Sequence, residues 1–317
     1  MKLKLLDFIV CPKCKSEFKL EVNEKDDEIK EGKLICNKCC TSYPVRNYIP
    51  RILLKLDPIE KKTAKTFGYE WTNFSKLYDT YKQQFLDWIK PLKPSFFKNK
   101  VVLDAGCGVG RHVFYSAIFG AKDIIGIDFS NSVDVAYQHV KQFSNAHIIQ
   151  SDIYNLPFKK PFDFIYSIGV LHHLPCPEKG FRKLIKHLKP KAHILIWVYG
   201  REGNLLLKTL LVLRKLTIKL PFKINKLISL FILILLYPIL LLYKPFKKIN
   251  LPHRDFLIYL SNFSLNQIHS IIFDQLIAPI ANYYRKEEIE QWFTNAGLKN
   301  VLISCRNKNS WKGTGVV

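Results

Sequence analysis

Three glycines at alternate positions give the first indication of chemistry in this chain. Residues 101–112 read VVLDAGCGVGRH, an apolar strand that reaches Asp104 and runs into Gly106, Gly108 and Gly110. Glycine has no Cβ, so such a loop can turn tightly and pass close beneath a bulky ligand. A carboxylate at Asp104 could face a cationic amino group of that ligand. Alone, the pattern also suits a dinucleotide site or a plain turn between a strand and a helix.

Acidic residues end or follow the next two apolar segments. Asp128 lies about 20 residues after the glycines, the position from which a carboxylate receives both hydroxyls of a ribose. Asp152 comes directly after a third apolar segment and could accept a hydrogen bond from an adenine amino group, while Ile153 packs on the ring face. A strand-terminal acid is common in proteins that bind no ligand there, so these residues predict a nucleoside site only as a set.

The elements that must position these residues are short apolar strands that alternate with amphipathic helices. The expected strands are residues 101–103, 124–128, 147–150, 162–167 and 193–198, with a helix at 178–188 before the last of them. Continuous apolar strands indicate an α/β fold with a parallel sheet covered on both faces. Right-handed crossovers bring the carboxyl ends of the strands to one edge, where ligands bind.

The middle of the chain resembles the class I S-adenosylmethionine-dependent methyltransferases, especially the type 11 group. The resemblance is carried by LDAGCGVGRH, GIDFS, QSDIYNLPF, FDFIYSIGVLHHLP and HLKPKAHILIWVYG. It implies a Rossmann-like, seven-stranded, mostly parallel sheet and S-adenosylmethionine as the cofactor. The implied cofactor-binding residues are Asp104, Gly106, Gly108, Gly110, Asp128, Phe129, Asp152, Ile153 and Ser167. Two departures, Lys191-Ala192 for Gly-Gly and Cys176 for an acid, bear on acceptor choice more than on the cofactor.

Two histidines are the catalytic candidates. His172 and His173 follow the fourth strand, where the loop that faces the substrate lies in similar enzymes. A sulfonium methyl group is already activated, so alignment can supply ~7–11 kcal/mol of the barrier and a base only assists. An imidazole could take the proton near neutral pH. The alternative is that one or both histidines only shape the loop.

Two C-x-x-C pairs near the start of the chain predict a zinc ribbon. Cys11 and Cys14 are separated from Cys36 and Cys39 by 21 residues, a spacing that folds two turns around one tetrahedral ion. Cys40 could replace Cys39 as the fourth ligand. The segment resembles small zinc-ribbon proteins that activate methyltransferases, although Arg46-Asn47 stands where these usually have Asp-Gly. Four thiolates leave no open coordination position, so the zinc is expected to be structural.

Bulk properties restrict the class of protein. The chain has 317 residues, 48% of them hydrophobic, with eight cysteines and a net charge of +23. This composition suits one packed sheet domain with small additions and excludes a disordered chain. The paired spacing of the cysteines indicates a reducing cytosol, and no signal peptide is visible. The expected location is cytoplasmic, with a peripheral position at the inner face of the membrane as an option.

The expected domains include one unusual insertion. They are a zinc ribbon at 1–55, a helical cap at 56–99, a methyltransferase domain at 100–199 and 251–317, and a hydrophobic helical insertion at 200–250. The insertion has ten basic residues and one acidic residue, a net charge of +9, with seventeen uncharged residues between Lys226 and Lys244. One membrane crossing would divide the sheet between two compartments. A membrane-surface hairpin and a lid over the active site are the leading alternatives.

The sequence therefore predicts a methyltransferase for an apolar or membrane-associated small molecule. The expected partners are that acceptor and a membrane surface bound through residues 204–250, with nucleic acid as a weaker candidate. The stated alternatives are an enzyme that methylates RNA or a translation-related protein, and a scaffold that binds the cofactor without transfer. The zinc ribbon and the basic charge favour the RNA alternative.

Overall fold

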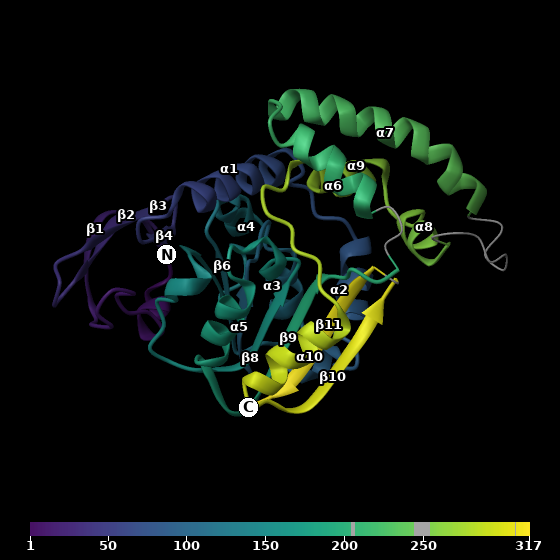
Figure 1. Cartoon of the computed structure of the whole chain (residues 1–317). Coiled ribbons are helices and arrows are strands. Elements are labelled where there is room, and N and C mark those ends of the chain that lie inside the picture. The colour runs from purple at the N-terminus through teal and green to yellow at the C-terminus, as the bar shows by residue number, and fades with distance from the viewer. Residues whose placement is uncertain (204–206, 244–253, 308) are drawn as a thin grey trace.

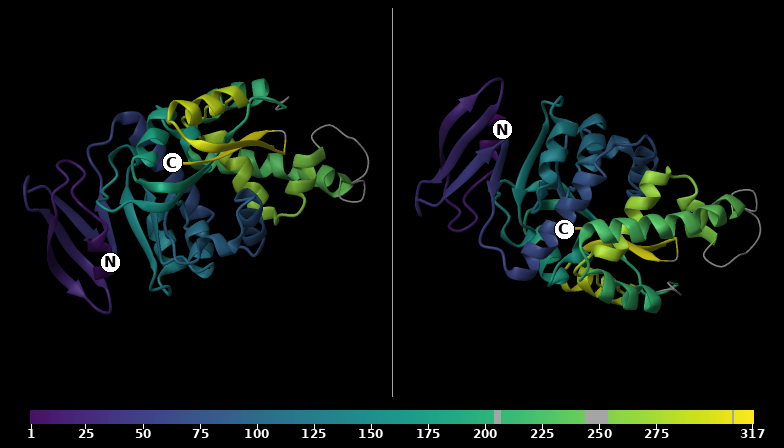
Figure 2. Two further views of the ribbon diagram at one scale, coloured as in Figure 1. Left: turned by 90° about the horizontal axis from the view of Figure 1, so that it is seen from below. Right: turned by 90° about the horizontal axis from the view of Figure 1, so that it is seen from above.

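The computed structural model describes residues 1–203, 207–243, 254–307 and 309–317 (Figure 1). A twisted sheet forms its centre, and helices cover both faces. The ribbon strands extend the sheet at one end, and a layer of helices lies over the edge where the parallel strands finish (Figure 2). Short 3-10 turns, which are η1 (Leu3–Asp7), η2 (Pro94–Phe97), η3 (Ile153–Asn155) and η4 (Leu171–His173), connect the longer elements.

Seven strands form the central sheet and confirm the predicted fold class. They are β5 (Val101–Ala105), β6 (Asp123–Asp128), β7 (Ala146–Ser151), β8 (Phe162–Ile168), β9 (Leu188–Tyr199), β10 (Lys299–Arg306) and β11 (Ser310–Val316). Their order is β7-β6-β5-β8-β9-β11-β10, and β11 runs antiparallel to both its neighbours while the others are parallel. The carboxyl ends of β5, β6 and β8 therefore meet at one edge.

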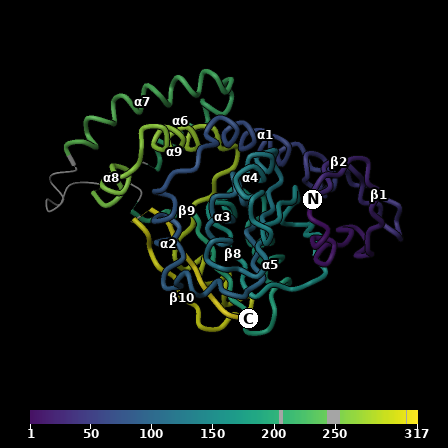
Figure 3. The backbone as a smooth tube through the Cα atoms, turned by 180° about the vertical axis from the view of Figure 1, so that it is seen from behind, coloured from purple at the N-terminus to yellow at the C-terminus, as the bar shows by residue number. Residues whose placement is uncertain are grey.

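Apolar residues on both faces hold this sheet between two helical layers. One face is covered by α2 (Thr80–Trp88), α3 (Arg111–Ile118) and α4 (Ser132–Val140). Their side chains, among them Phe85, Val113 and Val133, form one hydrophobic core with this face of the sheet. Phe181 and Phe293 bury the other face under α5 (Pro177–Ile185) and α10 (Lys286–Asn295). Because parallel strands are buried on both sides, their sequences are almost continuously apolar, as the sequence indicated. Figure 3 shows the same arrangement from behind.

The zinc-ribbon strands are part of the same sheet. The antiparallel strands β1 (Phe18–Lys25), β2 (Ile29–Cys36), β3 (Ser42–Arg46) and β4 (Ile49–Ile52) continue into the central sheet because β4 pairs in parallel with β7. The Arg51 guanidinium donates to both carboxylate oxygens of Asp134, at 3.2 and 2.6 Å, and to Oε1 of Gln150 at 3.1 Å. A shared sheet and a bidentate ion pair therefore attach the ribbon to the larger domain.

Helices from two distant parts of the chain form the layer above the carboxyl edge. α1 (Pro58–Asn73) begins with a capping box between Asp57 and Glu60, and α9 (Leu265–Ile277) with one between Ser264 and Gln267. α6 (Leu207–Thr217) and α7 (Phe222–Tyr243) pack on α9, and α8 (Arg254–Leu260) packs on α7. The helical layer thus continues past the expected boundary at residue 250. Residues 204–206 and 244–250 of the expected insertion lie outside the described residues.

α7 is the one helix of the described residues that is long and apolar enough to cross a membrane, over Phe222–Leu242. This assignment rests on length and composition, and the core helix of a soluble protein passes the same test. One face of α7 packs on α9 through apolar residues, and Ile232, Leu236 and Ile239 line a cavity beneath it. The helix therefore lies over the end of the sheet, and its role as a lid stays a prediction.

Candidate functional site

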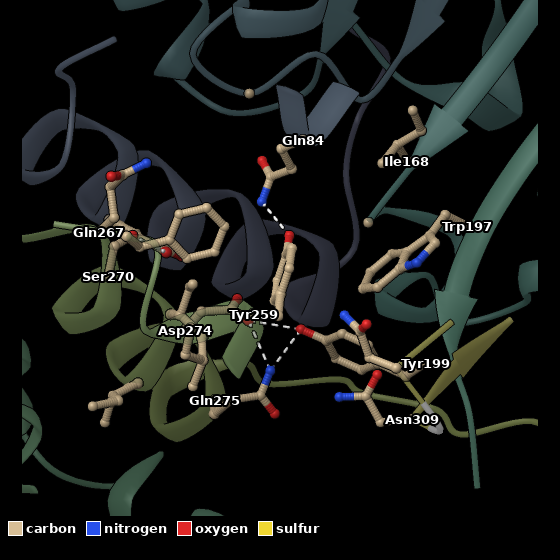
Figure 4. A pocket seen from close by; sticks show the side chains of 18 of the residues that line it. Gln84, Ile168, Trp197, Tyr199, Tyr259, Gln267, Ser270, Asp274, Gln275 and Asn309 are labelled. Atoms are coloured by element: carbon tan, nitrogen blue, oxygen red, sulfur yellow. Dashed lines mark hydrogen bonds between the residues drawn. The ribbon is translucent and has the colours of Figure 1, made fainter. Parts of the chain in front are cut away.

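A cavity of about 940 Å³ lies at the carboxyl end of the central strands. The loops after β5, β6 and β8 form its floor, α1 and α2 form one wall, and α7, α8 and α9 close it from above. Figure 4 shows polar and aromatic side chains that point into this space, among them Gln84, Trp197 and Tyr199. The cavity lies at the edge where the sequence predicted the ligand, as is general for open α/β sheets.

The glycine loop passes directly beneath the cavity. Gly106 has φ of +92°, and a Cβ on it would lie 2.3 Å from Cγ2 of Val170, so a side chain would not fit there. Gly110 has φ of +76° and is the N-cap of α3, whose amino end points toward the loop. Gly106 and Gly108 line the cavity, whereas Gly110 does not. The loop therefore provides the close backbone approach that a bulky cofactor requires.

Asp128 stands at the end of β6 with its carboxylate at the cavity. Oδ2 accepts a hydrogen bond from the Gly108 N–H at 3.0 Å, and Oδ1 accepts from the Ser130 N–H and hydroxyl at 2.8 and 2.7 Å. Burial raises the pKa of Asp128, and these hydrogen bonds oppose that rise. Phe129 also lines the cavity. The residues fit the ribose and base of S-adenosylmethionine, with the carboxylate available to both ribose hydroxyls.

Four further residues of the predicted cofactor set do not line the cavity. Asp104 is fully buried below the glycine loop, and this burial raises the pKa of its carboxyl group well above 3.8. Asp152 accepts hydrogen bonds from the Tyr154 N–H and the Asn155 amide at 3.0 and 2.8 Å. The other two are Ile153, which is packed in the core, and Ser167, whose hydroxyl donates to the Ala105 carbonyl at 2.8 Å. Their contacts with a cofactor remain predictions.

The two histidines after β8 have different surroundings. His173 lines the cavity and its Nδ1 lies 2.6 Å from the Ile280 carbonyl, so Nδ1 carries the proton and Nε2 keeps a lone pair. Burial lowers the pKa of His173 below 6.5, which keeps the ring neutral at pH 7. His172 is fully buried behind it, with its ring centre 3.8 Å from that of Tyr199, and does not line the cavity. Of the two, His173 has the geometry of a base.

The cavity also contains polar and charged residues that the sequence analysis did not select. The Arg111 guanidinium lies over the rings of Trp71, Tyr81 and Trp88, 4.8 to 5.6 Å from their centres. Glu70, on the same helix as Trp71, is fully buried and accepts a hydrogen bond from the Ser270 hydroxyl at 3.2 Å. The sequence signal for Glu70 was a charged residue between the aromatic residues Tyr69 and Trp71, a segment that only tertiary packing turns into a cavity wall.

The four cysteines of the C-x-x-C pairs come together in the ribbon. The Sγ atoms of Cys11, Cys14, Cys36 and Cys39 all lie within 4.8 Å of one another. The separations are 3.7 Å for Cys11 to Cys39 and 3.3 Å for Cys14 to Cys36. A tetrahedral zinc with Zn–S bonds of about 2.3 Å requires about 3.8 Å between sulfurs, so the cluster fits one structural zinc. Cys40 is exposed and outside the cluster.

Sequence comparison finds relatives named tRNA U34 carboxymethyltransferase. The one from Pseudoalteromonas translucida (strain TAC 125) is 33% identical over 122 residues, which cover 38% of this chain and 36% of the relative. The one from Aeromonas salmonicida (strain A449) is 28% identical over 193 residues, which cover 58% of this chain and 53% of the relative. The chain thus spans about a third to a half of the length of these curated relatives.

These names contradict two predictions. The expected apolar or membrane-associated small-molecule acceptor is wrong, and so is the expected set of partners with a membrane surface at residues 204–250, because the relatives are named for a tRNA substrate. The physical reason for the error is that an apolar helix at the edge of a cavity has the same sequence whether it faces lipid or roofs the site. The relatives' names agree better with RNA, the stated alternative.

Several solved structures cover most of the chain. One of them is the magnesium protoporphyrin IX methyltransferase from Synechocystis PCC 6803 with bound cofactor, at 14% identity and a TM-score of 0.47 over 83% of this chain and 98% of that one.

Two family models match the chain. The model described as "Trm112p-like protein" matches residues 2–47, which contain all four clustered cysteines. The model described as "Methyltransferase domain" matches residues 78–303, well over half of the chain, and includes the glycine loop, Asp128 and His173. This chain therefore belongs to the methyltransferase family, as a class I, S-adenosylmethionine-dependent enzyme with a zinc ribbon at its N-terminal side.

Proposed function

We propose that this enzyme transfers the methyl group of S-adenosylmethionine to a nucleotide of tRNA in the cytoplasm. The names of the relatives support tRNA as the class of acceptor. The observation that carries the proposal is a basic groove beside the cavity, because an enclosed cavity alone does not distinguish a nucleotide from a small molecule.

The α5 groove is formed by one helix and two aromatic residues. It is lined by Cys176, Pro177, Glu178, Lys179, Arg182, Lys183, Lys186, Tyr284 and Trp292. It contains four cations and one acid, and that acid is already paired with Arg182 at 2.6 Å. Lys179, Lys183 and Lys186 form no ion pair with any other described residue. The groove is therefore a strongly positive surface with aromatic side chains next to it.

A short segment of chain links the lining of the cavity to that of the groove. Leu174 lines the cavity and Cys176, two residues later, lines the groove. A nucleotide that enters the cavity would thus place the adjoining phosphates along α5. Lysines beside a phosphate backbone supply affinity that does not depend on sequence. The net charge of +23 favours the approach of such a polyanion.

The cavity suits a base that has been turned out of its stack. It is enclosed by α7 and α9 and lined by aromatic residues such as Trp88 and Trp197. Enzymes that act on a nucleobase extrude it into a pocket of this kind. The cofactor supplies an activated methyl group, Asp128 and the glycine loop would orient it, and Nε2 of His173 would take the proton of the acceptor.

The proposal is tested by transfer to tRNA and by charge reversal in the groove. Purified protein with labelled S-adenosylmethionine should label tRNA, and mass spectrometry of the product nucleoside identifies the transferred group. The variant Lys179→Glu/Lys183→Glu/Lys186→Glu should bind tRNA more weakly, with the slope of log affinity against log salt reduced by about 3, and keep its affinity for S-adenosylmethionine.

A matched control comes from α1. Lys61, Lys62 and Lys65 are exposed on that helix and do not line the groove, so reversing all three makes the same change in net charge. This control variant should lose much less tRNA affinity. Equal losses of tRNA affinity in the two triple variants would show that tRNA does not bind specifically at the α5 groove. Absence of label in tRNA would contradict the proposed function.

A further inference from the structure

The turn that contains His173 is held by a segment 107 residues later in the chain. This segment, residues 280–282, follows α9 and contacts the turn through its backbone. The Ile280 carbonyl accepts the hydrogen bond from Nδ1 of His173 at 2.6 Å. The Asn282 N–H donates to the His172 carbonyl at 2.9 Å. The position of the imidazole therefore depends on contacts from outside its own loop.

The side chain of Asn282 contacts both sequence neighbours of His173. Its Nδ2 donates to the His172 carbonyl at 3.2 Å and to the Leu174 carbonyl at 3.3 Å. An amide nitrogen carries two N–H groups, so both hydrogen bonds can form at once. We call this pair of hydrogen bonds the Asn282 clamp. It ties the backbone on both sides of His173 to one side chain.

Packing restrains the His173 ring but does not choose between its two nitrogens. The ring centre of Phe67, on α1, is 4.8 Å from that of His173, and the ring centre of His172 is 4.1 Å away. These contacts restrict the tilt of the imidazole. The site of the proton is set by the Ile280 carbonyl, since a carbonyl oxygen can only accept a hydrogen bond.

We propose that Asn282 is a positioning residue for His173, which keeps the proton on Nδ1 and the lone pair on Nε2. A base needs a lone pair for the proton that it removes, so an imidazole with its proton on Nε2 cannot act through that nitrogen. Loss of the clamp would let the turn separate from Ile280 and let the proton occupy Nε2. The inference rests on the proposed function, because it concerns the base which that function assigns to the cavity.

NMR of the full chain with isotopically labelled histidine measures the site of the proton directly. The protein is saturated with S-adenosylhomocysteine, and the signals of His173 are identified by their absence in His173→Asn. At neutral pH the wild type should show the tautomer with the proton on Nδ1 alone. Asn282→Ala removes the clamp and should populate the tautomer with the proton on Nε2. Asn282→Asp should do the same, because its carboxylate keeps the size of the side chain but repels the two carbonyl groups.

Asn225→Ala is the matched control. Asn225 is 1% exposed and does not line the cavity, and its Nδ2 also lies within reach of two carbonyl groups, those of Thr217 and Leu220, at 2.9 and 3.4 Å. This variant loses the same kind of hydrogen bonds without touching the His173 turn. It should lower the melting temperature and leave the tautomer of His173 unchanged.

Kinetics with tRNA as the acceptor give a second readout. Both Asn282 variants should lower kcat by up to about 10²-fold, the loss that a misplaced reacting group can cause. The KM for tRNA and the affinity for S-adenosylmethionine should not change, because Asn282 does not line the cavity. Asn225→Ala should keep the wild-type kcat.

The outcomes separate the clamp from the proposed function. The Nδ1 tautomer alone in both Asn282 variants would overturn the inference, and so would the Nε2 tautomer in the wild type. A change of tautomer in Asn225→Ala as well, or an unchanged kcat in Asn282 variants whose tautomer has changed, would also overturn it. A change confined to the Asn282 variants, in a protein that does not label tRNA, would support the clamp and reject the proposed function.

Discussion

The backbone N–H of Gly108 donates a hydrogen bond of 3.0 Å to Oδ2 of Asp128. This contact joins the glycine loop after β5 to the end of the neighbouring strand β6, and Ser130 holds the other carboxylate oxygen from the opposite side. The acid is therefore fixed at the cavity before a cofactor binds, so little conformational freedom is lost on binding.

The first prediction concerns this carboxylate. Asp128→Ala should weaken binding of S-adenosylmethionine by at least the ~1.5–3 kcal/mol of a charged hydrogen bond, or about tenfold, in a calorimetric titration. Asp152→Ala in the same titration tests the predicted adenine contact, and should cost less because Asp152 is occupied by Tyr154 and Asn155. Unchanged affinity in the Asp128 variant would remove this residue from the site.

The second prediction concerns the metal. Elemental analysis should give one zinc per chain, and Cys39→Ser should lose it while Cys40→Ser retains it, because only Cys39 has its Sγ in the cluster. Removal of zinc should unfold the ribbon, since four-cysteine sites couple metal binding to folding. Loss of zinc in Cys40→Ser with retention in Cys39→Ser would reassign the fourth ligand.

The features that could be predicted from the sequence are those encoded by residues close together in the chain. The alternation of apolar strands and helices, the glycine loop and the two C-x-x-C pairs each have a periodicity or spacing that tertiary contacts do not alter. The placement of Asp128 and His173 at the cavity follows from the rule that ligands bind at the carboxyl ends of parallel strands.

Other features depend on contacts between distant residues. Asp152 has a local alternative to a ligand, because an aspartate readily accepts from the N–H two residues ahead. The pairing of β4 with β7 joins residues about a hundred positions apart and has no signal in either segment. Glu70 gains its neighbour Ser270 only when α9 packs on α1, so its burial could not be read from the aromatic segment around it.

The third prediction is a pH dependence of stability at Glu70. Its pKa is raised in the folded protein, so above about pH 4.5 the unfolded chain releases a proton that the native chain keeps. Stability contributed by this group is therefore full below pH 4.5 and declines as the pH rises toward the native pKa. Glu70→Gln removes this titratable group. In thermal denaturation, the melting temperature of the variant should therefore rise relative to that of the wild type as the pH increases from 4.5 to 8.

A constant difference between the two proteins over that pH range would show that Glu70 is ionised in the native state. Leu at the same position is the control for lost packing, since it has similar length but no polar atom.

The fourth prediction separates the two histidines. His173→Asn should lower kcat by about 10²–10⁴-fold with little change in cofactor affinity, the range typical of a lost general base. His172→Asn should lower kcat less and reduce the melting temperature more, because His172 is fully buried and does not line the cavity. Because the pKa of His173 is lowered, the acid limb of kcat should lie below pH 6.5. A limb above pH 6.5 would assign it to another group.

Transfer to RNA is tested by following the labelled methyl group into the fractions of a cell extract. Purified protein is incubated with S-adenosylmethionine labelled in its methyl group and a cell extract separated into lipid, protein and RNA fractions. We expect label in the RNA fraction, within tRNA, and its loss in the Lys179→Glu/Lys183→Glu/Lys186→Glu variant. Label confined to the lipid or the protein fraction would show that the acceptor is not RNA.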